Sequence, residues 1–245
     1  MNPELEEAVR RRISPAILSA AAGLVLFSYA GGSGAQPVLA TGPDADVTEE
    51  GLHRVHPSIM EAAWVRPDLD LSGYTRILLM PTAVQFRDVD ERTYDARSRI
   101  HVTEFAVEDE RKEWLRRVWR GAVDAEFTQK ESYELYYEVG PNVLVVQGFL
   151  VDVVCHIPPR SVGSDFTFVR DPWIASVVLE LRDATTAELL ARTIDRRTGE
   201  GFMDAGEAWM RTEDLVERWA RVLSNRLDQL SDVGGRGRGT PPLAR

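Results

Sequence analysis

The longest apolar run of the chain covers residues 143–157 and is rich in β-branched side chains. Successive side chains of a strand point to opposite faces, so the run predicts one long strand or two joined strands. One face is apolar except for Gln147, and it consists of Val143, Val145, Gln147, Phe149, Val151, Val153, Cys155 and Ile157. We expect this face to be covered and the opposite, mixed face to be half-covered or turned toward a partner. A bulge at Gly148 would exchange the faces beyond it.

Two other stretches have apolar residues at helical spacing. Residues 107–129 begin with Glu108, Asp109 and Glu110, where the helix dipole favours acids, and continue with an apolar stripe. The second stretch starts at Thr212, which we interpret as its N-cap. Its stripe consists of Leu215, Trp219, Leu223, Leu227 and Leu230. The two stretches predict two long helices that cover a sheet.

Shorter strands are expected on both sides of the central run. Residues 74–86 predict a strand that is interrupted at Pro81, because proline cannot donate to a ladder. Residues 133–139 alternate as a short strand, and residues 174–182 and 189–196 predict a hairpin. The fold class is therefore α/β (α+β), a two-layer sandwich. We expect a mixed or mainly antiparallel sheet of about five strands, with the two long helices on one face.

The N-terminus resembles an export signal. Arg10, Arg11 and Arg12 precede an apolar heart of about eleven residues, which matches a signal peptide better than the roughly 20 residues of a membrane span. Small residues then offer a cleavage site after Ala35, with a second candidate after Ala30. If cleavage fails, residues 13–30 would act as a membrane anchor. The predicted organisation is a signal peptide over 1–35, a linker or arm over 36–70, one domain over 71–232, and a disordered tail over 233–245.

Charge and cysteine content narrow the set of partners. The formal net charge is −10, with acids spread along the chain, so nucleic acid and anionic lipid are not favoured partners. Contact with a membrane would occur only through an uncleaved N-terminal segment. Cys155 is the only cysteine, so no intrachain disulfide can form.

Residue sets that suggest chemistry are weak. His53 and His56 have a metal-like spacing, but Pro57 disfavours a shared helix face and no further ligands lie nearby. Cys155 and His156 are adjacent on a strand, so their side chains point to opposite faces and cannot form a nucleophile and its base. The acidic residues between Asp88 and Asp95 lack the spacing of a calcium loop. The sequence predicts no catalytic set, no metal site and no cofactor.

Three stretches resemble a bacterial exported and lipoprotein-like family known as the domain of unknown function 3313 family. They are residues 66–74 before the Ile77 strand, residues 140–144, and residues 179–183 with the hairpin to Arg196. The resemblance implies an exported protein, and it transfers no functional residues. Many family members are lipoproteins, but this chain has no cysteine after its apolar segment, so lipid attachment is not expected. Ala187 also stands where the hairpin of the family tends to have glycine.

These observations favour an exported, periplasmic or secreted cell-envelope protein that acts as a non-catalytic interaction or assembly module. Its partner would be another envelope protein or a second copy of the chain. The candidate interaction face combines the mixed side of the central run with loop tryptophans: Leu144, Val146, Leu150, Val154, Trp173 and Trp209. The alternative is a periplasmic enzyme or small-ligand carrier. A pocket joining Trp173 or Trp209 to Asp165, Asp171 or Glu207 would favour that alternative.

Overall fold

The computed structural model describes residues 38–39, 46–56, 61–89, 104–159 and 168–233. All of them belong to the larger of two compact units, residues 37–245. The predicted signal peptide, its cleavage site after Ala35 and the alternative anchor over 13–30 lie outside the described residues. All but the first residue of the predicted tail also lie outside them.

The described strands form a large mixed sheet. Nine strands take part, in the order β1-β2-β3-β10-β9-β7-β4-β6, with β5 also paired to β7. Their bounds are Val38–Leu39 (β1), His53–His56 (β2), Ala62–Val65 (β3), Arg76–Leu79 (β4), Ala83–Phe86 (β5), Glu134–Leu135 (β6), Val143–Cys155 (β7), Trp173–Asp183 (β9) and Leu189–Thr198 (β10). The mixed α+β class is confirmed, although the sheet is larger than the expected five strands.

The central run forms β7, which organises the sheet as its length predicted. Strand β9 pairs antiparallel with β7 on one side and with β10 on the other, so the expected hairpin is confirmed. On its second side, β7 pairs in parallel first with β4 and then with β5. Pro81 lies between these two short strands, where the sequence predicted an interruption.

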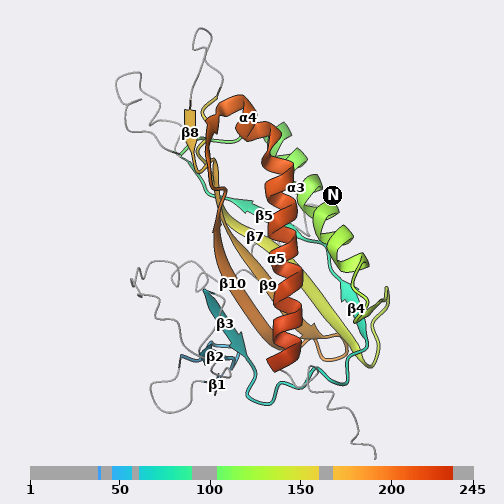
Figure 1. Cartoon of the computed structure of the whole chain (residues 1–245). Coiled ribbons are helices and arrows are strands. Elements are labelled where there is room, and N and C mark those ends of the chain that lie inside the picture. Colours follow the sequence, from blue (N-terminus) through green and yellow to red (C-terminus); the bar gives the residue numbers. More distant parts are fainter. Residues whose placement is uncertain (1–37, 40–45, 57–60, 90–103, 160–167, 234–245) are drawn as a thin grey trace, which may run out of the picture. The chain divides into compact units, whose positions relative to one another are not determined.

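Two long helices lie side by side over one face of the sheet (Figure 1). They are α3, Asp109–Thr128, and α5, Thr212–Val233, and a short helix α4, Ala205–Met210, leads into α5. The side chains of Trp119, Phe127, Leu223 and Leu227 are buried against the sheet. A further pair of strands, β8 (Phe168–Arg170) and β11 (Phe202–Asp204), forms a separate two-stranded sheet next to α4. The two predicted helices and their covering role are confirmed.

The helices cover the opposite face of β7 from the one that the sequence favoured. Leu144, Val146 and Leu150 belong to the main core together with the helix stripes. Gly148 lies on the same face, and a Cβ atom added to it would lie 2.5 Å from Cδ2 of Leu223 on α5. The glycine therefore permits close approach of α5 rather than forming the expected bulge.

The bulge of β7 occurs four residues later than predicted. The register with β9 shifts between Val151 and Val154, and Asp152 takes a φ of 55°. Aspartate is one of the few residues that enters this left-handed region at modest cost. The shift turns Val153 and Cys155 toward the helix side, where both join the main core.

The carboxylate of Asp152 ties the bulge to two other strands. The guanidinium of Arg87, one residue after β5, donates to both oxygens at 2.7 and 2.5 Å, and Arg196 of β10 donates at 3.3 Å. Partial burial alone would raise the pKa of Asp152, but the two arginines outweigh it and the pKa is lowered.

We expect Asp152→Asn to lower the free energy of unfolding by about 1 kcal/mol at neutral pH, since charge-assisted bonds at a half-buried site are lost. A lowered pKa contributes stability above the unfolded-state pKa of about 3.9, and that contribution is lost as pH falls through the folded pKa. Urea denaturation should therefore show a smaller difference between the two proteins at about pH 3 than at about pH 7. An equal difference at both pH values would contradict the ion-pair role.

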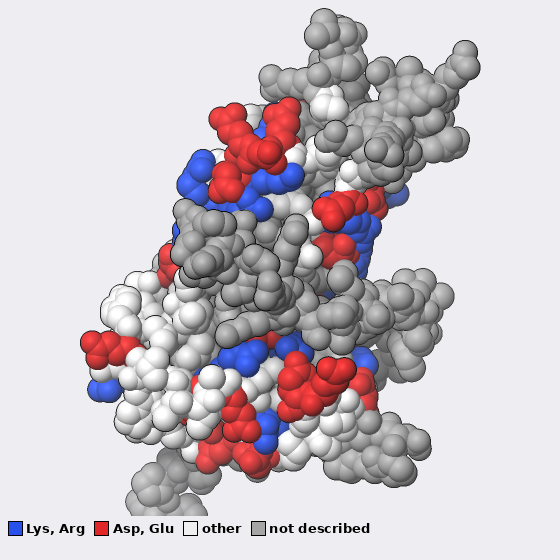
Figure 2. All heavy atoms as spheres, turned by 180° about the vertical axis from the view of Figure 1, so that it is seen from behind, with Lys and Arg blue, Asp and Glu red and all other residues white. Residues whose placement is uncertain are grey.

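The sheet face away from the helices carries buried ion pairs and a small apolar cluster. Arg192 donates to Glu180 at 2.8 Å and to Glu50 at 3.1 Å, and Arg182 donates to the second oxygen of Glu180 at 2.8 Å. The cluster consists of Leu52, Ala62, Trp64 and Leu189, with Ile194 beside it. In Figure 2, acidic and basic side chains are interspersed on the described part of this face.

The sequence predicted a linker or arm over residues 36–70, and the described strands within this range correct that prediction. Strands β2 and β3 extend the main sheet beyond β10, and Leu52 and Glu50 lie against its rear face. The sequence did not predict these strands, because each has only four residues and shows no clear period. Proline and acidic residues nearby also favoured the interpretation as a linker or arm.

Candidate interaction site at the α4 end

The candidate interaction face predicted from the sequence is buried within the chain. The exposed fractions of Leu144, Val146 and Leu150 are 0%, because α5 covers their side of β7. Val154 and Trp173 are each only 1% exposed. The bulge at Asp152 places Val154 on the rear face of the sheet, whereas Trp173 lies in the main core. These side chains hold the fold together and are not available to a partner.

Trp209, the remaining predicted contact residue, is partly buried in a group of aromatic rings. Its ring lies 5.3 Å from that of Trp173 in an edge-on arrangement and 6.4 Å from that of Trp114 on α3. The guanidinium of Arg111 stacks 3.9 Å above the same ring. Trp209 therefore joins α4 to α3 and to the start of β9.

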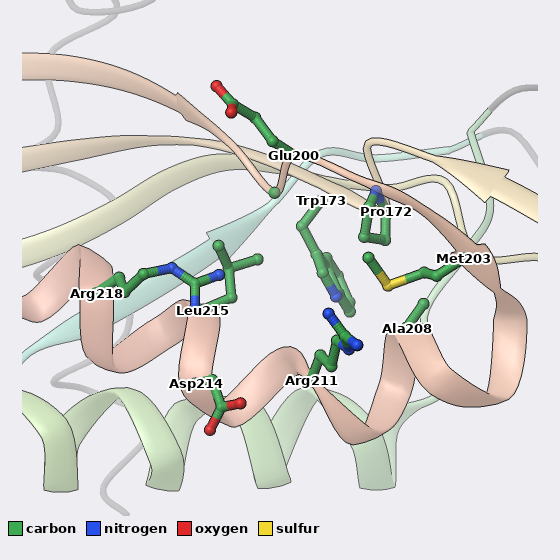
Figure 3. A pocket seen from close by; sticks show the side chains of 10 residues that line it. Pro172, Trp173, Glu200, Met203, Ala208, Arg211, Asp214, Leu215 and Arg218 are labelled. Carbon is green, nitrogen blue, oxygen red and sulfur yellow. The ribbon is translucent and has the colours of Figure 1, made fainter.

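A small pocket opens beside this aromatic group, where the start of β9 faces the start of α5. Its volume is about 120 Å³, and its lining residues are Pro172, Trp173, Gly199, Glu200, Met203, Ala208, Arg211, Asp214, Leu215 and Arg218. Figure 3 shows Trp173 directed from β9 toward α5, with Arg211 and Arg218 rising from the helix. The floor is apolar and buried, whereas the charged residues of the rim are exposed.

Local geometry fixes the floor of this pocket. The indole N–H of Trp173 donates to Oγ1 of Thr212 at 3.0 Å, and that hydroxyl donates to the carbonyl of Ala208 at 2.8 Å. Thr212 thus connects β9, α4 and α5. A Cβ atom on Gly199 would lie 2.6 Å from Cδ2 of Leu215, so glycine lets the end of β10 approach α5 at the wall of the pocket.

The size of the pocket limits what it can hold. About 120 Å³ equals the share of roughly four waters in the liquid, well below the roughly 300 Å³ or more of sites for drug-sized ligands. Asp171 and Glu207 do not line it, and Asp165 lies outside the described residues. Among the described residues, the pocket thus contains Trp173 but neither Asp171 nor Glu207, two of the acids whose presence would have favoured an enzyme or a ligand carrier.

Two phenylalanines form an exposed patch at the same end of the molecule. Phe168 of β8 and Phe202 of β11 stack with ring centroids 5.0 Å apart and an angle of 5° between their planes. They are 57% and 71% exposed, and Met210 at the end of α4 is 76% exposed. We call Phe168 and Phe202 the aromatic patch. Large apolar side chains gathered on a surface are typical of contact with a partner.

The sequence does not predict this patch, because both strands adjoin stretches rich in glycine, proline and polar residues, which are typical of loops. Each strand has three residues, too few to show a period, and glycines precede β11 at positions 199 and 201. The only signal was an aromatic residue beside a second apolar residue in each loop, Phe168-Val169 and Phe202-Met203.

The described residues do not bring a reactive set together. Burial raises the pKa of the Cys155 thiol to about 12, so the thiolate needed for nucleophilic attack is suppressed. His156 points away and its Nδ1 bonds the carbonyl of Asp171 at 2.8 Å. In the part of the chain that the structure describes, no group of three or more His, Cys, Asp or Glu residues could hold a metal ion.

A second hollow runs between α3 and α5 on the outer side of the helix layer. It is a wide groove of about 630 Å³ with small residues in its floor, Gly121, Ala122 and Ala125. Charged residues of both signs border it, and Arg221 pairs with Glu126 across it at 3.4 Å. The groove is open and polar, and the ion pair spans the two helices.

Comparison with known proteins gives distant structural similarity only. No protein-family model matches the chain, and no curated protein matches it. A Xanthomonas campestris protein of the domain of unknown function 330 family aligns with a TM-score of 0.40 and 8% identity, over 70% of this chain and 93% of that chain. A Helicobacter pylori homologue of a neuraminyllactose-binding hemagglutinin aligns at 0.36 and 8%, over 69% and 93%.

A third solved structure is the dodecamer of PelC from Paraburkholderia phytofirmans. It aligns with a TM-score of 0.28 and 10% identity, over 66% of this chain and 94% of that chain. All three similarities are too low to transfer a function or an assembly state.

Proposed function

We propose that the chain is an exported cell-envelope protein without catalytic activity, which serves as an interaction or assembly module. The observation that carries this proposal is the aromatic patch, where two stacked rings stay exposed on the paired strands β8 and β11 beside α4. Burial against a partner would remove more apolar ring surface from water than the stacking of the two rings alone does.

The export part of the proposal rests on the sequence of residues 1–35. Among the described residues, no helix is both long and apolar enough to span a membrane. The resemblance to the domain of unknown function 3313 family supports the same placement and stays a prediction. We expect N-terminal sequencing of the mature protein to begin at Gln36.

The partner is proposed to be a protein. Acidic and basic side chains are interspersed on the described part of the face that Figure 2 shows, and the net charge of −10 opposes nucleic acid and anionic lipid. A polar rim around a few buried aromatic anchors is the usual anatomy of a protein interface.

A photoreactive amino acid in place of Phe202 tests the proposal in native cells. We expect a discrete cross-linked product in the envelope fraction. The control carries the same probe at Asp124, an exposed residue of α3 far from β11 in the sequence. Cross-linking that is absent at both positions, or equal at both, would contradict a docking role of the aromatic patch.

A further inference from the structure

Strands β8 and β11 continue the β9–β10 hairpin in the same register. Ile174 of β9 pairs with Thr198 of β10, and four residues farther along each strand Arg170 pairs with Phe202. No residue is therefore inserted between the two ladders. The two short strands form a two-stranded ribbon that extends the hairpin to the α4 end of the molecule (Figure 1). We call β8 and β11 the ribbon.

The ribbon has an open edge because β7 does not continue along it. The last bond from the end of β7 to this side of the hairpin runs from the N–H of His156 to the carbonyl of Pro172 at 2.9 Å. In the same register Pro158 would lie opposite Arg170, and proline has no N–H to donate. Pro158 lies outside β7, and among the described residues no strand pairs with the second edge of β8.

Two residues of β8 direct their backbone groups to this open edge. The N–H of Asp171 donates to the carbonyl of Gly201 on the β11 side, and the backbone groups of successive strand residues alternate in direction. The N–H and C=O groups of Phe168 and Arg170 therefore face away from β11. None of these four groups bonds another described residue. Such an edge is a template for a strand of another chain.

Strand β8 is complementary to itself in one antiparallel register. When Phe168 lies opposite Arg170 of a second copy, the reverse pair forms as well, because the two-fold axis passes beside Val169. All four outward groups of each copy then form hydrogen bonds. Each Arg170, which is exposed and has no ion pair with the described residues, would also lie beside the exposed ring of Phe168 of the other copy. A strand of unrelated sequence would satisfy the backbone groups alone.

We infer that two copies of the chain pair through the open edges of β8, antiparallel and with Phe168 opposite Arg170. This inference rests on the proposed assembly role and names one partner, a second copy. The product is a closed two-fold dimer in which the two ribbons form one four-stranded sheet. Each β8 has three residues, so the contact is small and we expect a transient dimer that a covalent bond can trap.

Two cysteine variants of the full-length chain trap this register. An equal mixture of Phe168→Cys and Arg170→Cys should form an intermolecular disulfide, because the Cα atoms of such opposite residues lie about 5.5 Å apart. Each variant alone should form little, since equivalent residues are displaced by two positions along the strands and lie beyond the roughly 7 Å that a disulfide can bridge. Non-reducing electrophoresis measures the product. Cys155 is 3% exposed and adds little background.

A proline in β8 tests whether backbone pairing causes the contact. When Arg170→Cys is mixed with Phe168→Cys/Arg170→Pro, the disulfide yield should fall about tenfold or more, because proline lacks the N–H that crosses the edge. The matched variant Phe168→Cys/Arg170→Ala keeps that N–H and loses only the ring contact, so its yield should fall about two- to fivefold. The N–H of residue 170 faces away from β11, so both variants should fold, and circular dichroism checks this.

The inference is overturned if the mixture forms no more disulfide than either variant alone, or if the proline and alanine variants behave alike. A photoreactive probe at Phe168 that captures only a different protein in the envelope would also overturn it. The pairing leaves the ring of Phe202, one strand farther from the two-fold axis, open to another partner. A failed disulfide therefore does not decide the cross-link at Phe202, and a failed cross-link there does not decide the disulfide.

Discussion

Replacing Asp195 with alanine is expected to lower the free energy of unfolding by about 3–5 kcal/mol, because it leaves a buried arginine without its counter-charge. Asp195 of β10 is 3% exposed and Arg226 of α5 is 7% exposed. The guanidinium of Arg226 donates to both carboxylate oxygens at 2.6 and 2.8 Å, and Arg197 donates to one of them at 3.0 Å. This pair fixes α5 to the sheet.

Urea denaturation followed by circular dichroism measures this loss. The control is the double variant Asp195→Leu/Arg226→Met, which replaces the whole pair with apolar side chains and should lie close to the wild type in stability. The ion-pair account fails if the single variant costs less than about 1 kcal/mol, or if the double variant is destabilised as much as the single one.

Trp173→Ala is expected to destabilise the protein by about 3–5 kcal/mol, the usual cost of removing a fully buried aromatic side chain. Trp173 is 1% exposed, contacts Trp209 edge-on and bonds Thr212. Removal of its side chain would create a cavity in the core, and this cavity would open into the pocket.

Phe202→Ala is the matched comparison for Trp173→Ala. Because Phe202 is 71% exposed, its replacement should change the free energy of unfolding by no more than about 0.5 kcal/mol. Thermal and urea unfolding of both variants separate a core residue from a surface residue. If the two losses were similar, or if Phe202→Ala cost more, the assignment of the two aromatic positions would be contradicted.

The elements that dominate the core could be predicted from the sequence. Residues 143–157 and the stripe from Leu215 to Leu230 are long enough for their periods to be plain, and both gave the observed strand and helix. The interruption at Pro81 was also predictable, because its cause is local.

The face of β7 that meets the helices could not be predicted. Both faces are largely apolar, and the choice depends on Leu223, far away in the sequence, packing onto Gly148. The position of the bulge depends on Arg87 and Arg196, which stabilise Asp152 from two other strands. These are tertiary causes that a local pattern does not contain.

The candidate site was missed for a similar reason. A pattern of apolar residues predicts that they are buried, but it does not say whether the chain itself or a partner covers them. The sequence therefore placed the interaction face on the strongest apolar run and did not include the two isolated phenylalanines. Exposure of Phe168 and Phe202 arises only when two three-residue strands pair beside α4.

Thiol labelling tests most directly whether a partner covers the α4 end. The native Cys155 is 3% exposed and its pKa is raised by burial, so it gives little background in the folded chain. A cysteine in place of Phe202 should react readily with a maleimide in the purified protein and slowly in the intact envelope, whereas a cysteine at Asp124 should react readily in both. Equal labelling of the Phe202 position in both settings would contradict the account.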